Sequence, residues 1–225
     1  AAEINSPDVY TLSNGFIEVN VSKKNGGFDV RTVEGDKLKK DDNNKNLLFP
    51  LGENDTSFTS FRVTRGGETK DYIFGGKYGF LGLTDRMVTV TQDAAGITAT
   101  WGVDDLNFTQ RIELANSGSN NHGMAYISYK AETTGAPADI KARILMDTAL
   151  GFQDYAIYEL SGADSSYTRV EREGVYSNED GSLYEKTFFA YDDVHNPTIL
   201  AYTVNSTVND NECVPEKVAF GHWNN

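Results

Sequence analysis

Apolar and polar residues alternate along much of this chain, and this period of two restricts its fold more than any other feature. Successive side chains of a β-strand point to opposite faces, so the alternation predicts strands with one buried face. No stretch holds a sustained helical period of 3.6 residues. The alternation is clearest in residues 17–22, 28–33, 97–103, 108–114, 140–146 and 218–223.

Further short runs rich in β-branched and aromatic residues are typical of strands, and turn signals such as Asn25-Gly26-Gly27 and Gly66-Gly67 separate them. The sequence therefore predicts an all-β fold, a large antiparallel β-sandwich of a dozen or more strands with little or no helix. With no linker or repeat, we expect one domain over residues 1–225. The additional strand-like runs are 58–64, 72–74, 86–91, 124–131, 155–160, 186–191 and 198–204.

The chain is acidic, with 20 Lys and Arg against 33 Asp and Glu and a formal net charge of -13. A negative surface repels phosphate, so we expect neither nucleic acid nor anionic lipid as a partner. The most basic run, residues 36–42, holds as many acids as bases and is typical of a solvated loop. No apolar run is long enough for a membrane span. The single cysteine, Cys213, excludes an internal disulfide and a cysteine-based zinc cluster.

Several short motifs spread over nearly the whole chain, and the most specific is Arg143-Ile144-Leu145-Met146-Asp147-Thr148-Ala149-Leu150-Gly151. With them the chain resembles a family of uncharacterised secreted bacterial proteins that carry a galactose-mutarotase-like β-sandwich, or supersandwich. The resemblance implies that fold, an extracellular or cell-surface setting and a longer multi-domain parent chain, but no known activity. The other motifs are residues 12–18, 26–28, 41–42, 47–50, 56–62, 71–75 and 220–223.

One acidic residue in the most specific motif is predicted to be structural. Asp147 follows an alternating run, and Thr148 and Gly151 indicate a tight bend in which an Asp can accept backbone N–H bonds. The relatives carry Asn-Asp-Gly after this glycine, and here only Asp154 matches. We therefore interpret Asp147, Thr148, Gly151 and Asp154 as turn residues.

No catalytic signature is present. Mutarotases of this fold use a histidine with a carboxylate, yet His122, His195 and His222 stand in no such motif, and His222 beside Trp223 is the best functional candidate among them. Glycoside hydrolysis needs two carboxylates, and with 33 acids such pairs arise by chance. The carboxylate candidates are Asp104, Asp105, Asp147, Asp154, Glu171 and Glu173.

We expect no metal and no cofactor. Three oxygen-rich runs, residues 41–44, 178–181 and 209–212, leave calcium as the one weak candidate. None of them fits an EF-hand loop, and polar turns explain them better. Nucleotide-binding and nucleophile-elbow glycine motifs are absent from the sequence.

Aromatic residues supply the best binding candidates. Residues 71–80 hold four rings interleaved with glycines, and exposed Tyr or Trp rings can stack on the C–H faces of sugars. We predict ligand-binding roles for Tyr72, Tyr78, Trp223 and His222, and a core position for Trp101.

The sequence thus favours a non-catalytic extracellular domain that contacts carbohydrate or neighbouring domains of its parent chain. Two alternatives stay open. One is a mutarotase-like or other glycan-processing enzyme, and the other is a purely structural or protein-binding module.

Overall fold

The structure is a computed structural model, and its description covers most of the chain. The described residues divide into two compact units, 1–149 and 150–225, which we treat separately. Apart from the 3₁₀ turn Phe74–Gly76, every element in them is a β-strand. The described residues are 8–34, 38, 40–51, 56–76, 88–115, 123–151, 156–161, 166–171, 173–177, 187–193, 195–204, 207–208, 211–212 and 216–221.

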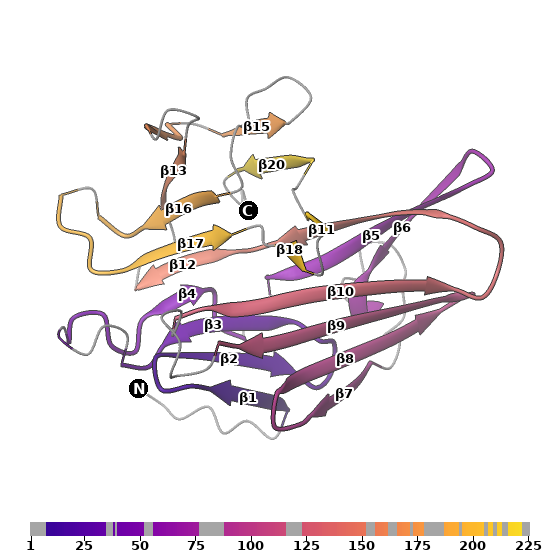
Figure 1. Cartoon of the computed structure of the whole chain (residues 1–225), viewed down its shortest axis with the longest axis horizontal. Coiled ribbons are helices and arrows are strands. Elements are labelled where there is room, and N and C mark those ends of the chain that lie inside the picture. Colours follow the sequence, from indigo (N-terminus) through magenta and orange to yellow (C-terminus); the bar gives the residue numbers. More distant parts are fainter. Residues whose placement is uncertain are drawn as a thin grey trace. The chain divides into compact units, whose positions relative to one another are not determined.

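Three antiparallel sheets build the first unit (Figure 1). Their strand orders are β1-β2-β3-β4-β12, β10-β9-β8-β7 and β11-β5-β6, and β12 spans the division between the units. The strands are β1 (Val9–Ser13), β2 (Ile17–Ser22), β3 (Phe28–Thr32), β4 (Asn46–Leu48), β5 (Phe58–Arg65), β6 (Glu68–Ile73), β7 (Thr89–Gln92), β8 (Gly96–Val103), β9 (Leu106–Leu114), β10 (Ala125–Thr133), β11 (Asp139–Leu145) and β12 (Thr148–Gly151).

The second unit is built from shorter strands. A four-stranded sheet has the order β14-β13-β16-β17, and two pairs, β15-β20 and β18-β19, complete the unit. The strands are β13 (Ile157–Ser161), β14 (Tyr167–Arg169), β15 (Gly174–Ser177), β16 (Thr187–Tyr191), β17 (Leu200–Val204), β18 (Thr207–Val208), β19 (Asn211–Glu212) and β20 (Lys217–Phe220).

One face of the β10-β9-β8-β7 sheet supplies apolar side chains to two clusters in the first unit. Trp101 and Phe108 pack with Phe61 of β5, and further along the same face Ile97 and Ile112 pack with residues of β2 and β3. Phe61 and Phe108 stack at 4.2 Å between ring centroids. The core position predicted for Trp101 is confirmed, since only 2% of it is exposed. The apolar side chains that alternate along β8 and β9 therefore pack against two other sheets.

A close approach of two turns explains the glycines near Phe74. Gly75 has φ of 75°, and a Cβ placed there would overlap the carbonyl oxygen of Asn25. A Cβ on Gly26 would lie 2.7 Å from the Phe74 ring. The predicted turn at Asn25-Gly26-Gly27 is thus locked against the Phe74–Gly76 turn, and neither glycine can be replaced without displacing its neighbour.

The second face of β2 is also buried, but it is polar. Thr11, Asn20 and Asp29 are paired across β1, β2 and β3. The Thr11 hydroxyl donates to Asn20, the Asn20 amide donates to Asp29 Oδ1 at 2.9 Å, and the Leu51 N–H donates to Asp29 Oδ2 at 2.7 Å. Burial raises the pKa of the Asp29 carboxyl above its ordinary value, although the hydrogen bonds from Leu51 and Asn20 oppose the shift.

A small aromatic cluster forms the core of the second unit. Phe220 of β20 contacts the rings of Tyr158, Tyr176 and Phe188 at centroid distances of 4.7 to 5.8 Å. Leu160 is the other buried residue of this cluster. The inner face of the four-stranded sheet thus packs on the β15-β20 pair, and its other face is left for other contacts.

The prediction of an all-β fold in antiparallel sheets with little helix is confirmed. Most predicted runs coincide with strands, and the Gly66-Gly67 turn joins β5 to β6 with both residues at positive φ, as a tight hairpin requires. The β-sandwich arrangement and the single domain over residues 1–225 stay predictions. Strands β1, β4, β12, β14, β15, β18 and β19 were not predicted, because two to five residues show too little of a period.

Candidate functional site

The outer face of the β14-β13-β16-β17 sheet gathers aromatic, aliphatic and charged side chains, and we call it the aromatic face. Cross-strand pairing places Glu159 beside Arg169 of β14 and Phe189 of β16. The next row joins Ile157, Tyr191 and Leu200 of β13, β16 and β17. Because paired residues share a face, these side chains lie together. The aromatic face consists of Ile157, Glu159, Tyr167, Arg169, Phe189, Tyr191 and Leu200.

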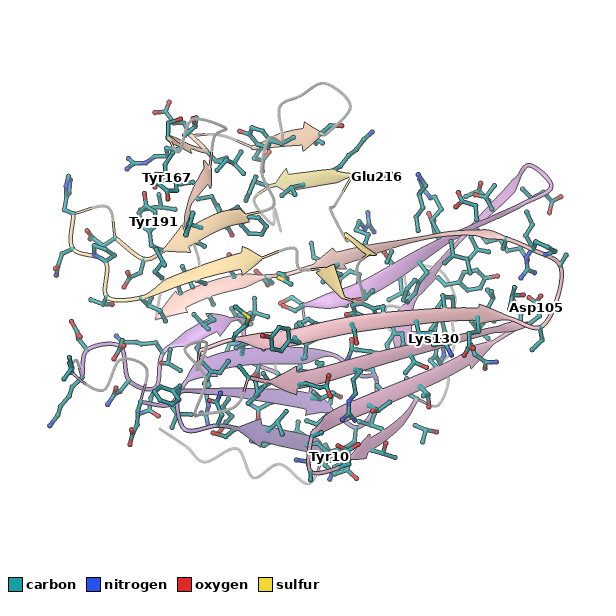
Figure 2. The ribbon with its side chains drawn as sticks, viewed as in Figure 1. Tyr10, Asp105, Lys130, Tyr167, Tyr191 and Glu216 are labelled. Carbon is teal, nitrogen blue, oxygen red and sulfur yellow. The ribbon has the colours of Figure 1, made fainter. Side chains whose placement is uncertain are left out.

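An exposed tyrosine stands at one edge of the aromatic face. Tyr167 is 59% exposed, and its ring meets the half-buried ring of Phe189 edge-on at 5.3 Å between centroids and 77° between planes. An edge-to-face contact of this kind fixes the orientation of a ring. Phe189 therefore holds Tyr167 while leaving much of its surface to solvent. Figure 2 labels Tyr167 and Tyr191 on this sheet.

A positioned carboxylate lies beside these rings. The buried Tyr191 donates its hydroxyl to Glu159 Oε1 at 2.6 Å, and Arg169 Nη2 lies 3.9 Å from the same oxygen. Burial and the hydrogen bond to Glu159 raise the pKa of the Tyr191 hydroxyl. Glu159 and Arg169 both keep part of their side chains in contact with solvent. The aromatic face therefore offers an acceptor and a cationic donor at fixed positions.

These groups suit a ligand that is apolar on one face and rich in hydroxyls at its rim. A tyrosine ring covers apolar surface at low entropic cost, whereas a carboxylate accepts hydrogen bonds and a guanidinium donates them. The groups of the aromatic face can therefore bind such a ligand by stacking and by hydrogen bonds.

The four predicted ligand-binding residues do not come together in the described structure. Tyr72 is only 8% exposed; its ring belongs to the core of the first unit, and its hydroxyl donates to Asp104 Oδ2 at 3.1 Å. Burial and this hydrogen bond raise the pKa of Tyr72. A ring packed in this way has little surface for a sugar. Tyr78, His222 and Trp223 lie outside the described residues.

The adjacent carboxylates Asp104 and Asp105 serve different partners. Asp104 accepts from Tyr72, while Asp105, at the end of the β8–β9 hairpin (Figure 2), accepts from Arg65 Nη1 at 2.8 Å and from the Thr133 hydroxyl at 3.1 Å. Arg65 holds the pKa of the Asp105 carboxyl below its usual range. Asp105 thus ties hairpin ends together, Asp104 ties its own turn to β6, and we assign neither to catalysis.

The predicted turn residues lie around β12. The Asp147 N–H donates to the Ser57 hydroxyl at 3.1 Å, and its carbonyl accepts from the Phe49 N–H at 2.8 Å. Thr148 and Gly151 are the first and last residues of β12, and Gly151 has φ of 70°. The backbone of Asp147 anchors this strand, whereas the role of its carboxylate stays a prediction. Asp154 lies outside the described residues.

Among the described residues, His195 is the one histidine, and its side chain interacts electrostatically with the carboxylate of Asp193 in an exposed turn. The backbone N–H of His195 also donates to Asp193 Oδ1, and His122 lies outside the described residues. Within the described ranges, no three His, Cys, Asp or Glu side chains are placed to hold a metal ion. No helix among those residues has the length and apolar character to cross a membrane.

Sequence reasoning did not find the aromatic face. Tyr167 and Arg169 alternate in a strand of three residues, which is too short to detect by period. Glu159 and Phe189 lie in predicted runs, but only the pairing of the strands joins them. The alternation of Tyr167 and Arg169 was the one local signal.

The comparisons with known proteins give no relative for this chain. No family model, no curated protein and no solved structure matches it.

Proposed function

We propose that this chain is a non-catalytic carbohydrate-binding domain and that the aromatic face is its binding surface. The observation that carries the proposal is the exposed ring of Tyr167, held edge-on by Phe189 beside the hydrogen-bonded Glu159. A ring with neighbouring acceptor and donor groups fits the C–H face and hydroxyl rim of a pyranose. The extracellular setting and the longer parent chain belong to the same proposal and rest on the sequence resemblance.

The finer fold is also part of the proposal. We infer a β-sandwich of the galactose-mutarotase-like kind, or supersandwich, for the strands of the first unit. The support is that one face of the β10-β9-β8-β7 sheet shares apolar clusters with β5 and β6 and with β2 and β3. Facing sheets with interdigitated apolar side chains are what such an architecture requires.

A glycan array probed with the purified chain tests the proposed function. We expect a saturable signal for at least one neutral glycan, and a loss of that signal in Arg169→Ala and a reduction in Glu159→Gln. Arg65→Ala is the matched control, because it removes an arginine–carboxylate pair from the first unit. A blank array, or an equal loss in the control, would contradict the proposal.

A further inference from the structure

The exposed groups of the aromatic face are spread over more than the width of one sugar ring. Tyr167 on β14 and Leu200 on β17 lie at opposite ends of the strand order β14-β13-β16-β17, and they are 59% and 53% exposed. Tyr167 pairs with Ser161 of β13, whereas Leu200 lies in the row of Ile157, four residues away along β13. Three strand spacings across the sheet and four residues along it separate the Cα atoms of Tyr167 and Leu200 by about 15–20 Å.

A pair of opposite charges lies between these two ends. Glu159 pairs with Arg169 of β14 and with Phe189 of β16, and this row lies between the row of Tyr167 and the row of Leu200. Arg169 Nη2 lies 3.9 Å from Glu159 Oε1, and their side chains are 41% and 26% exposed. Glu159 and Arg169 are the only ionic groups among the seven residues of the aromatic face, so their charges cancel. The middle of the face therefore suits hydroxyl groups, and an ionic ligand gains no net attraction from it.

The strands of one sheet present all of these groups. Side chains on one face of a sheet stand roughly perpendicular to it and form a continuous surface. A polymer can lie across such a surface and leave it in both directions, whereas groups that recognise a chain end must close around it as the walls of a pocket do. The exposed positions of Tyr167 and Leu200, at the two ends of the face, fit the first arrangement.

Given the proposed function, on which this inference rests, we propose that the aromatic face binds an internal stretch of a linear, uncharged polysaccharide. The stretch is about three to four sugar units long, since each unit of an extended chain advances by about one strand spacing. The ring of Tyr167 stacks on one unit, and Arg169 and Glu159 hydrogen-bond to the hydroxyls of the middle units. Leu200 and Ile157 cover the apolar face of the last unit.

The test is calorimetric titration of the full chain with oligosaccharides of one to six units, cut from a linear glycan that the array selects. We expect the affinity to rise about tenfold or more from one unit to about four, and to change by less than about twofold beyond that length. Several copies of the chain should bind along one molecule of the intact polysaccharide.

A substitution at the far end of the face adds a second readout. Leu200→Ser should remove about three- to fivefold of the affinity for four units and leave the affinity for one or two units unchanged. Val175→Ser is the matched control, because Val175 is an exposed aliphatic residue of β15 in the same unit. Circular dichroism spectra that match the unmodified chain confirm that both variants are folded.

The outcomes separate this inference from the proposed function. Equal affinities for one and four units, a single copy bound per polysaccharide molecule, or selection of charged glycans alone would overturn the internal, uncharged stretch and leave carbohydrate binding in place. An equal loss in Val175→Ser would overturn the role of Leu200 and with it the length of the site. A blank array would contradict the inference and the proposed function together.

Discussion

The two units of this chain differ in how fully they bury their large aromatic side chains. In the first, Phe61, Trp101 and Phe108 are at least 98% buried between sheets. In the second, Phe220 is the centre of a small core packed on one face of the β14-β13-β16-β17 sheet, while Tyr167 and Leu200 are more than half exposed on the other face of that sheet. Apolar side chains that a unit does not bury are available to a ligand. The difference supports placing the proposed binding surface in the second unit.

The largest expected effect is the removal of a central ring from the first unit. Phe108→Ala deletes contacts with the rings of Phe61, Trp101 and Tyr72. We expect the free energy of unfolding of this unit to fall by about 3–5 kcal/mol. Denaturant unfolding measures it, with Tyr167→Ala expected to cost less than about 1 kcal/mol. Equal losses of unfolding free energy in Phe108→Ala and Tyr167→Ala would contradict the difference in burial between the two units.

A second prediction concerns the locked turns of the first unit. Gly75→Ala and Gly66→Ala both place a side chain at positive φ, but only at position 75 does the new Cβ meet a backbone atom; nothing lies within 4 Å of it at position 66. We expect Gly75→Ala to lower the free energy of unfolding by about 2–4 kcal/mol and Gly66→Ala by about 1 kcal/mol. Denaturant unfolding measures both variants. A smaller loss for Gly75→Ala than for Gly66→Ala would contradict the close approach of Gly75 to the backbone of Asn25.

A third prediction uses the buried carboxyl of Asp29. Its pKa is higher in the folded chain than in the unfolded chain, so the folded chain binds the proton more tightly. The stabilisation from this proton is complete below the unfolded pKa and is lost as pH rises through the folded pKa. We expect the stability of the unmodified chain relative to Asp29→Asn to fall as pH rises above about 4.

Unfolding of both proteins at a series of pH values measures that difference. Taking the difference is necessary because Asp71 and Asp105, whose pKa values are lowered, give slopes of the opposite sign. A difference that is constant with pH, or that rises with it, would show that burial does not raise the pKa of Asp29.

The smallest expected effect is at Tyr72. Tyr72→Phe keeps the buried ring and removes the hydrogen bond to Asp104. We expect a loss of about 1 kcal/mol in the free energy of unfolding and unchanged glycan binding. Unfolding curves and glycan-array signals of this variant separate a role in stability from a role in binding. A loss of glycan binding at unchanged stability would show that Tyr72 binds the ligand.

Much of the fold could be predicted because long strands display their period. Residues 97–103 alternate fully, and β8 buries the predicted face with Trp101 in it. Edge positions could not be predicted in the same way. Ile144 alternates like a core residue but is 40% exposed, because β11 is an edge strand of its sheet. The alternation in a sequence shows which side chains share one face of a strand, but it does not show what covers that face.

The aromatic face could not be predicted, because strand register creates it. Tyr167 and Phe189 are far apart in sequence and meet through β13, which pairs with both of their strands.

The most direct test of the central claim is calorimetric titration of a glycan selected by the array into two tyrosine variants. Tyr167 and Tyr126 are both exposed strand tyrosines, but Tyr126 lies on β10 of the first unit. We predict that Tyr167→Ala weakens binding about tenfold or more and that Tyr126→Ala leaves it unchanged. Equal affinities in the two variants would contradict the assignment of binding to the aromatic face.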